Sequence, residues 1–504
     1  MEISSSEKYL SLVLNSLENI VMPALDAGDT KATAEIMKGV LLDLIKRERF
    51  TPRLLAEHIA QGRVVARSLA TLVAELQGTS ADGSGAEERP APSAAGFNAL
   101  AAEHRDLTAR IALLTDQLAS LRPRTSDNSR QQYISALLHQ AARWEYAYYS
   151  GQRDADATPS PVPPAPKGAP LNRDTLQAFL RQQHPAGSRC AVTAFQSIPG
   201  GFGKQTFRIT VEADGASETL IVRKSDPTPM VVHGGFFIDQ EFHLLKDVAG
   251  SDLPVATPLY LGVDVPGVDA DFYVMSTLPG KVAGSFLGAA SAVIPESVVL
   301  HMAELMARLH QLKLETFSTF LSRYGHAGAL TETTEACYRR NIAEWREYFA
   351  KGDHLPSPFV TYMLDWLEQH VPPNQNPPVL VHGDFNIHNV LAEDGRVSGI
   401  LDWECAMFGA PEQDLAYIKP IISNHIGWDR FLSHYRASGG PQIDEAAMNF
   451  YMAFSSMRLN IVFNKGVHNL QLGVTRDIRY ALVEMGLTTE FMKLALASTS
   501  GGSA

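Results

Sequence analysis

One short segment of the chain concentrates the side chains best suited to chemistry. An apolar run ending at Val381 leads into His382 and Asp384, Asn389 follows five residues after Asp384, and a second apolar run leads to Asp402. Transfer of a phosphoryl group needs a carboxylate that orients an attacking hydroxyl and accepts its proton, and it needs hard oxygen ligands for Mg²⁺. The types and spacing therefore predict Asp384 as the catalytic base and Asn389 and Asp402 as the metal ligands.

His382 belongs to the same predicted catalytic loop, but it fits a side chain that bonds the loop backbone better than one that carries a proton. His388, which lies between the key positions, fits a bystander better than a participant. A single His-x-Asp can be a surface turn, and a single Asn is usually a loop residue. The joint spacing of the polar residues between two apolar strands argues against that simpler interpretation.

This pattern resembles the H-x-D-x-x-x-x-N loop and the following I-L-D of the aminoglycoside phosphotransferase and choline kinase family, relatives of the protein kinases. Gly383 stands where protein kinases carry arginine, and Trp403-Glu404 follows Asp402, which favours a small-molecule kinase. The resemblance implies ATP and Mg²⁺ as cofactors. It also implies that Asp414 braces the catalytic loop from a following helix.

The chain upstream of this loop is expected to hold ATP. A glycine-rich stretch lies between two predicted strands, where backbone N–H groups can approach phosphates closely. The next strand ends in Arg223 and Lys224, where the family carries a lysine that neutralises phosphate charge; strand alternation matches Arg223 to it and turns Lys224 to the opposite face. Both are kept as nucleotide-binding candidates, with Glu241 on the next helix as the counter-ion. The glycine candidates are Gly200, Gly201 and Gly203.

A hinge between two lobes is predicted in the stretch 272–280. It resembles the family's connection between lobes, in which backbone groups hydrogen-bond adenine in an apolar slot. The candidates are Met275, Ser276 and Thr277, although Met275 also fits a simple core residue.

The elements around these motifs form a β-rich part followed by an α-rich part. Two apolar, β-branched runs on either side of Asp214-Gly215 predict a hairpin. Together with the resemblance, the pattern predicts an α+β, bilobal protein-kinase-like fold, with a small antiparallel β-sheet lobe and a larger helical lobe, preceded by an all-α bundle. The predicted strands are 205–211, 217–223, 258–263, 271–276, 378–382 and 398–402, and the predicted helices are 238–248, 296–312, 334–350 and 357–370.

Two segments with little to bury divide the chain. Residues 78–96 carry no large apolar side chain and residues 152–170 are rich in proline, so neither repays its ordering entropy by burial. Apolar residues at helical spacing predict five helices, some before residue 78 and the others between the two segments. The predicted domains are a helical bundle at 1–151 with a flexible loop at 78–96, a linker at 152–170, an ATP-binding N-lobe at 171–280 and a catalytic, acceptor-binding C-lobe at 281–504. The part after the linker is expected to fold without the bundle.

Composition narrows the class of protein. The 504 residues are 45% hydrophobic and 19% charged, with a formal net charge of −12, which is typical of a globular protein and argues against nucleic acid as a partner. The three cysteines are too few and too scattered for a disulfide framework or a CxxC site. No signal segment or membrane-spanning run is evident, so we expect a cytoplasmic protein without a membrane partner.

The phosphate acceptor is the least determined part of the prediction. Residues 403–504 hold nine Asp or Glu and eight Lys or Arg, which is not the acidic surface that a polycationic aminoglycoside would favour. The run 448–458 is apolar and rich in methionine, as in a buried helix or in the wall of an acyl-binding site. The chain also resembles the kinase branch that accompanies acyl-CoA dehydrogenases. We therefore expect a hydroxylated metabolite of hydroxyacyl type as the partner, with an aminoglycoside or macrolide kinase, or a pseudokinase scaffold acting through the bundle, as alternatives; a homodimer is left open.

Overall fold

The computed structural model describes residues 6–25, 29–49, 52–78, 97–122, 127–151, 168–198, 203–231, 233, 236–284, 294–351, 353–472, 474, 480 and 483–499. By packing, the chain divides into two compact units that are discontinuous in sequence. One unit comprises Met1–Pro163, Trp345–His370 and Ser456–Ala504, and the other comprises Pro164–Glu344 and Val371–Ser455.

The second unit opens with a five-stranded antiparallel sheet in the order β1-β2-β3-β5-β4. The hairpin between β2 and β3 turns at Asp214 and Gly215, which both have positive φ, as the Asp-Gly signal predicts. The strands are β1 (Ala191–Ile198), β2 (Lys204–Ala213), β3 (Ala216–Ser225), β4 (Pro258–Gly262) and β5 (Phe272–Ser276).

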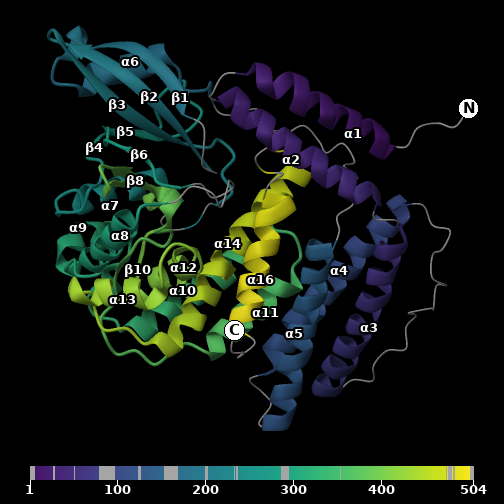
Figure 1. Cartoon of the computed structure of the whole chain (residues 1–504). Coiled ribbons are helices and arrows are strands. Elements are labelled where there is room, and N and C mark those ends of the chain that lie inside the picture. The colour runs from purple at the N-terminus through teal and green to yellow at the C-terminus, as the bar shows by residue number, and fades with distance from the viewer. Residues whose placement is uncertain are drawn as a thin grey trace, which may run out of the picture. The chain divides into compact units, whose positions relative to one another are not determined.

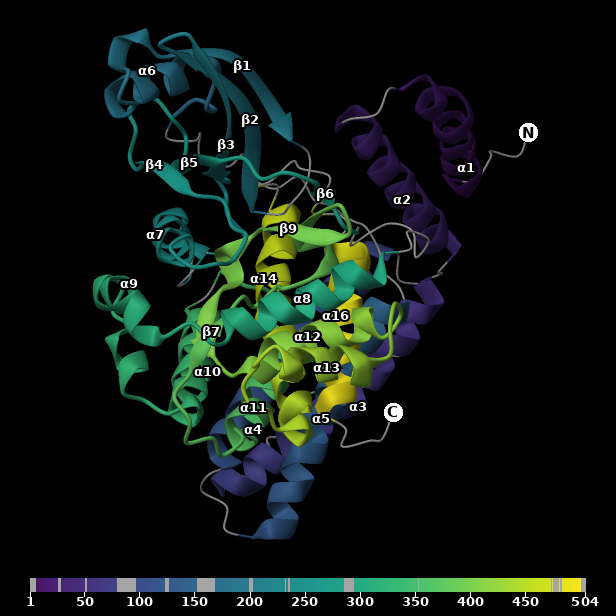
Figure 2. The ribbon, with the colours of Figure 1, turned by 60° about the vertical axis from the view of Figure 1, so that its left-hand side comes forward.

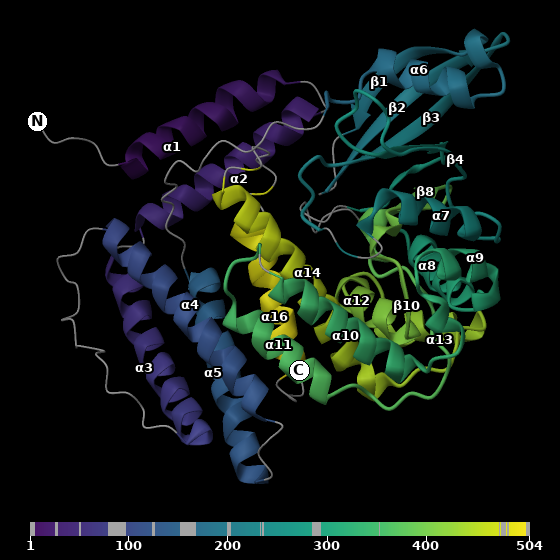
Figure 3. The ribbon, with the colours of Figure 1, turned by 180° about the vertical axis from the view of Figure 1, so that it is seen from behind.

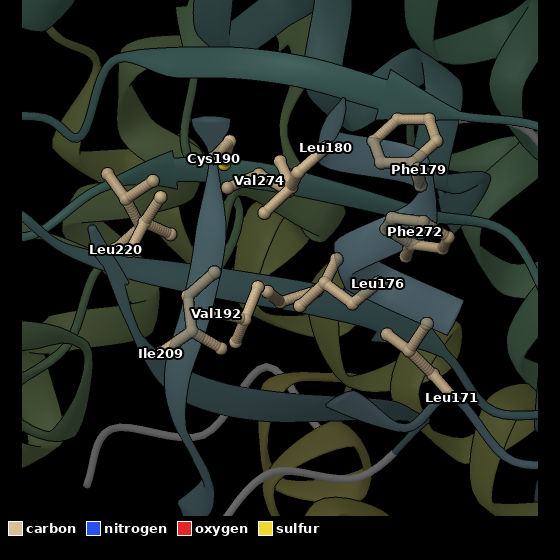
Figure 4. Packing of buried hydrophobic residues seen from close by; sticks show 12 residues of the cluster. Leu171, Leu176, Phe179, Leu180, Cys190, Val192, Ile209, Leu220, Phe272 and Val274 are labelled. Atoms are coloured by element: carbon tan, nitrogen blue, oxygen red, sulfur yellow. The ribbon is translucent and has the colours of Figure 1, made fainter. Parts of the chain in front are cut away.

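One face of this sheet is covered by α6 (Arg173–Gln183), a helix that begins with a capping box at Asn172. Leu176 and Leu180 of α6 pack with Ile209 and Val222 of the sheet in one apolar cluster (Figure 4). Each fully buried aliphatic side chain contributes about 1.5–3 kcal/mol. Because alternate strand residues face opposite sides, burial of Val222 under α6 turns its neighbour Arg223 to the other face.

The rest of the second unit is mainly helical, with two small sheets among the helices. Strand β7 (Val379–Val381) pairs with β10 (Met407–Gly409), and β6 (Lys281–Val282), β8 (Val390–Glu393) and β9 (Arg396–Ile400) pair in the order β6-β8-β9. Helix α8 packs on α13 and β9, and α12 packs on β7 and α13 (Figure 2). The helices of this unit are α7 (Ile238–Val248), α8 (Glu296–Leu309), α9 (Ser318–Arg323), α12 (Pro411–Ile422) and α13 (Trp428–Ala437). Two further helices, α10 (Thr334–Ala350) and α14 (Met448–Gln471), begin in the second unit and end in the first.

The first unit is helical. Helix α1 packs on α2, α3 packs on α4 and α5, and the later helices α11 and α16 pack against α5 (Figure 1, Figure 3). No helix in the described part of the chain is long and apolar enough to cross a membrane. The helices are α1 (Ser6–Ser16), α2 (Asp29–Arg49), α3 (Pro52–Gln77), α4 (Phe97–Leu121), α5 (Asn128–Gly151), α11 (Pro358–Gln369) and α16 (Thr488–Thr499).

The grouping of 345–370 and 456–504 with the N-terminal helices differs from the predicted C-lobe at 281–504. Nine of the twelve residues of α11 are buried, and a helix that is buried nearly all round needs partners on several sides. Glu145 of α5 fixes its start by accepting hydrogen bonds from the Ser357 hydroxyl at 3.0 Å and the Phe359 N–H at 2.8 Å. The boundaries at 151, 170 and 280 stay a prediction, and most of the loop 78–96 and of the linker lies outside the described residues.

Candidate functional site

The predicted catalytic loop connects β7 to β8, and it brings Asp384 and Asn389 into contact. The Asn389 amide group donates to the Asp384 backbone carbonyl at 3.0 Å and to Asp384 Oδ2 at 2.7 Å. Asp384 Oδ1 is shielded from solvent and has no hydrogen-bond partner among the described residues. His388 Nε2 lies 3.8 Å from Asp384 Oδ2, beyond hydrogen-bond distance. One carboxylate oxygen is thus fixed, and the other is left for an incoming donor.

His382 acts as a strut within this loop. It is fully buried, and its two ring nitrogens lie 3.3 Å from the Asp384 N–H and 2.9 Å from the Leu401 carbonyl. Since the Asp384 N–H donates to Nδ1, the proton must lie on Nε2, where it is donated to Leu401. His382 therefore links the loop that carries Asp384 to the residue before Asp402. This placement suits a loop brace, and the role of His382 stays a prediction.

Asp414, on α12, holds the start of the same loop. Its two carboxylate oxygens accept the His382 and Gly383 N–H groups, each at 2.8 Å, and His310 Nε2 lies 3.1 Å from Oδ2. Burial alone would raise the pKa of Asp414, but the hydrogen bonds from His310 and from the His382 N–H hold it below the ordinary value. The carboxylate therefore stays ionised and keeps both N–H groups in place.

Gly383 cannot be replaced without moving the chain. Its φ is +76°, and a Cβ atom at this position would lie 2.2 Å from the backbone oxygen of Cys405. Only glycine both tolerates this positive φ and leaves room for the Cys405 oxygen. The Gly383 that distinguishes this loop from the protein-kinase pattern is therefore required by the approach of the segment that follows Asp402.

Arg223 links the β-sheet to the predicted metal-binding residues. Its Nε lies 2.9 Å from Glu241 Oε1 on α7, its Nη2 binds Asp402 Oδ1, and Nη2 lies 3.6 Å from Glu404 Oε2. The Tyr273 hydroxyl donates to Glu241 Oε1 at 3.2 Å. The structure thus brings Arg223 and Glu241 together, as the sequence predicts, and adds Asp402 to the pair.

The pKa values of the two partly buried carboxylates in this cluster, Asp402 and Glu404, shift in opposite directions. Burial raises the pKa of Glu404 to about 7. The positive charge of Lys204 lowers this pKa, and the negative charge of Asp402 raises it. Burial also opposes ionisation of Asp402, but Arg223 and Lys204 outweigh it and hold the pKa of Asp402 below its ordinary value. Asp402 is therefore the permanent anion of the pair. Its backbone adopts the left-handed conformation, with φ +65°.

Asn389 and Asp402 carry side-chain oxygen atoms, the kind of ligand that Mg²⁺ prefers. The Leu401 N–H donates to the Asn389 carbonyl at 2.8 Å, which places Asn389 beside the segment that carries Asp402. The Asn389 amide nitrogen is occupied by Asp384, so its side-chain oxygen points elsewhere. No cluster of three His, Cys, Asp or Glu is present in the described ranges, and Mg²⁺ usually takes only one or two carboxylates besides phosphates and water.

Several residues predicted to bind the nucleotide are placed less favourably for that role than Arg223 is. Lys224 is fully buried on the α6 face, with its Nζ 2.9 Å from Asp269 Oδ1, so the prediction that it binds the nucleotide is not supported. In the predicted hinge, the Ser276 N–H already donates to Thr257, while Met275 and Ser276 are half-buried and Thr277 is exposed. Gly203 has a φ of +80°, which glycine tolerates. Gly200 and Gly201 lie outside the described residues.

Two site residues escaped the sequence analysis. Lys204 is buried and Glu404 is partly buried, and Lys204 Nζ lies 3.0 Å from Glu404 Oε2. A signal for each existed, because Lys204 ends the glycine-rich stretch and Glu404 is the second residue after Asp402. The strand alternation that assigned Arg223 a face would also have placed Lys204, once the β2–β3 register was known.

Comparison with known proteins identifies the family of the chain. The profile described as the phosphotransferase enzyme family (APH) matches residues 194–451. Acyl-CoA dehydrogenase family member 11 of Mus musculus is 27% identical over 309 residues, which cover 56% of this chain and 38% of the relative. The chain thus spans less than two fifths of that relative's length.

Two antibiotic-modifying proteins also share similarity with the chain. Hygromycin-B 4-O-kinase of Escherichia coli is 46% identical over 69 residues, which cover 13% of this chain and 20% of the kinase. The structure of a thermostable mutant of the aminoglycoside phosphotransferase APH(4)-Ia, in complex with ADP and hygromycin B, has a TM-score of 0.43 at 17% identity and covers 65% of this chain and 100% of its own. Since the family profile spans just over half of the sequence and includes the whole of the catalytic loop, the chain belongs to the phosphotransferase enzyme family.

Proposed function

We propose that this protein transfers the γ-phosphoryl group of ATP to a hydroxyl group of a small molecule, with Asp384 as the base. The observation that carries the proposal is Asp384 Oδ1, a shielded carboxylate oxygen to which no described residue donates. Leaving a buried acceptor without a donor costs about 1–3 kcal/mol. An acceptor hydroxyl would remove that cost, and its proton would pass to the same oxygen during transfer.

The other residues take the roles that their contacts allow. Asn389 and Asp402 would hold Mg²⁺, which neutralises charge on the phosphates when it is bound. Arg223, fixed by Glu241 at 2.9 Å, would bind phosphate oxygens with the guanidinium N–H groups that Asp402 does not use. Asn389 would also keep Asp384 aligned through its 2.7 Å hydrogen bond.

For the acceptor, we favour a hydroxyacyl-type metabolite over an antibiotic. The near balance of acidic and basic residues after position 403 supports this choice, because a polycationic acceptor would favour an excess of carboxylates. The relatives named acyl-CoA dehydrogenase family members support it as well. The short match to hygromycin-B 4-O-kinase supports the alternative, phosphorylation of an aminoglycoside.

The test is a search for acceptor-dependent release of ADP. The protein is mixed with ATP and Mg²⁺ and with separate pools of hydroxyacyl compounds, aminoglycosides and macrolides, and each active pool is then divided to find the acceptor. A hydroxyacyl acceptor is expected. Turnover with an aminoglycoside alone would favour the alternative, and ATP binding without turnover in any pool would indicate a scaffold rather than an enzyme.

A further inference from the structure

Lys204 lies on the face of the sheet that carries Arg223. It begins β2 directly after the glycine-rich stretch, and the Gly203 carbonyl is fixed by a hydrogen bond from the Asp226 N–H at 3.0 Å. Thr206, two residues further along β2, is paired with Arg223 of β3. Directly paired residues and alternate residues of a strand share a face. The two cations therefore project from the sheet in the same direction.

The Lys204 ammonium group is held in place by two acceptors. Only 7% of Lys204 is exposed. Its Nζ donates to the Phe236 carbonyl at 2.7 Å and lies 3.0 Å from Glu404 Oε2. Glu404 Oε2 is also 3.6 Å from Arg223 Nη2, and the same guanidinium atom binds Asp402. Lys204 thus belongs to one cluster with the residues proposed to bind Mg²⁺ and phosphate.

Burial of the Lys204 ammonium group has an unfavourable desolvation free energy, which suggests a functional reason for its position. Desolvation of an ammonium group costs several kcal/mol, and a buried ion pair is often no more stabilising than an apolar pair of the same volume. Lysine also carries its charge on a flexible stem, so the ammonium group can change partners without movement of the backbone. These properties suit a cation that can exchange its carboxylate partner for an anionic ligand.

We propose that Lys204 is a second phosphate-binding cation of the nucleotide site, beside Arg223, and that Glu404 positions its ammonium group until the phosphates of ATP take the place of the carboxylate. This inference rests on the proposed function, because it assumes that ATP binds on this face of the sheet. Glu404 is then a positioning residue that competes with the phosphates for Lys204. Removal of Lys204 and removal of the Glu404 charge should consequently have opposite effects on nucleotide affinity.

The test compares ATP with adenosine by titration calorimetry, with and without Mg²⁺. Lys204→Met keeps the length of the side chain and removes its charge, so ATP affinity should fall by about 10- to 100-fold while adenosine affinity changes by less than about threefold. Glu404→Gln should raise ATP affinity, because it removes the charged carboxylate that competes with the phosphates for Lys204. Lys224→Met is the matched control, because it removes a fully buried lysine from the opposite face of the same sheet; its ATP affinity should stay within about threefold of the wild type.

A purely structural salt bridge predicts a different pattern. Lys204→Met and Glu404→Gln would then weaken ATP and adenosine together, and this result would overturn the inference, as would wild-type ATP affinity in Lys204→Met. Retention of adenosine binding by Lys204→Met shows that the variant is folded. If the wild-type chain binds neither ATP nor adenosine, both the proposed function and the role of Lys204 fail. If the wild type binds ATP and Lys204→Met binds it equally well, only the role of Lys204 fails.

Discussion

The two oxygens of the Asp384 carboxylate have different surroundings, and that difference predicts the effect of changing the residue. Asn389 fixes Oδ2 at 2.7 Å, while Oδ1 is left without a partner among the described residues. Asp384→Asn keeps the shape of the side chain but cannot accept a proton. We expect kcat with the identified acceptor to fall by about 10²-fold or more, with little change in ATP affinity, because the base acts mainly in the transition state.

The control for this substitution is Asp394→Asn, an exposed aspartate in the turn between β8 and β9. Asparagine tolerates the positive φ of this position, so the control should keep wild-type kcat. Measurement of ADP release and of ATP affinity for both variants decides the matter. If Asp384→Asn retained most of its kcat, Asp384 would not be the base.

Gly383 offers a test of the geometry around the base. Alanine at Gly383 adds both the strain of a φ of +76° and a contact of 2.2 Å with the Cys405 backbone oxygen. Gly325 has almost the same φ, +75°, but no atom lies within 4 Å of the place that a Cβ would take there, so it separates the two causes. We expect Gly325→Ala to lower the free energy of unfolding by about 1 kcal/mol and Gly383→Ala by about 3 kcal/mol or more. Equal losses in chemical denaturation would show that the loop can move away from Cys405.

The convergence of the residues in the loop after β7 was predictable because they are close in sequence. His382, Asp384 and Asn389 occupy one turn between two short strands, so their spacing alone suggests how they converge. Lys204 and Glu404 are two hundred residues apart in sequence, and their contact depends on how the sheet meets the segment after β9. No local sequence pattern predicts this contact, so the pairing of Lys204 with Glu404 is evident only from the structure.

Among the elements, the junction of α5 with α11 predicts an unusual pH dependence. Glu145 of α5 is buried, and burial raises its pKa to about 7 despite the hydrogen bonds from Ser357 and Phe359. In the unfolded chain the same carboxyl loses its proton near its ordinary value of 4.5. Between these two values the folded state binds more protons than the unfolded state, so the free energy of unfolding should decrease as the pH rises from about 4.5 to about 7.

Glu145→Gln tests this effect, because glutamine can accept the same two hydrogen bonds without a charge. At pH 8 the variant should be more stable than the wild type by up to about 3 kcal/mol, and at pH 5 the two should differ by about 1 kcal/mol or less. Denaturation curves across this pH range provide the measurement, with the exposed Asp116→Asn on α4 as the control. An identical pH profile for the wild type and Glu145→Gln would contradict the expected cost of ionising this buried carboxyl.

The elements themselves were mostly predictable. The observed α7, α8 and α10 begin and end within a few residues of the predicted helices 238–248, 296–312 and 334–350, since apolar residues recur at helical spacing in each. The Asp-Gly turn placed the β2–β3 hairpin for a similar reason. Periodicity did not reveal α11's partners, because a helix that is apolar nearly all round gives no single face from which a neighbour can be assigned.

At the scale of the whole chain, the two units are each assembled from separate stretches of sequence. The first unit joins helices from before residue 163 with α11 and α16. Arg122, at the end of α4, forms an ion pair with Asp365 of α11 at 2.8 Å, and the Thr489 hydroxyl at the start of α16 donates to the Tyr149 carbonyl at 3.1 Å. The division between the two units at Pro163 and Pro164 falls within the proline-rich linker, but residues 345–370 and 456–504, which follow the linker in sequence, also belong to the first unit.

This organisation changes the expected result of a truncation. The sequence predicted that the chain after the linker folds without the bundle, but removal of residues 1–151 takes away α4 and α5, on which α11 packs. Phe359, Met363 and Leu367 of α11 are fully buried. Each such side chain contributes about 1.5–3 kcal/mol, and the whole protein is stable by only about 5–15 kcal/mol. The truncated chain should therefore aggregate or unfold.

Deletion of residues 1–50 is the matched comparison. It removes α1 and α2, which pack on each other, and it leaves α3, α4 and α5 with α11 and α16. Because the extensive packing of α1 and α2 among the described residues is with each other, this shorter deletion should give a soluble protein that keeps ATP affinity, as judged by size-exclusion chromatography, circular dichroism and calorimetry. A soluble, cooperatively unfolding chain that begins at residue 152 and binds ATP like the wild type would show instead that α11 and α16 can be held without the N-terminal helices, and that the bundle is an appendage of the kinase.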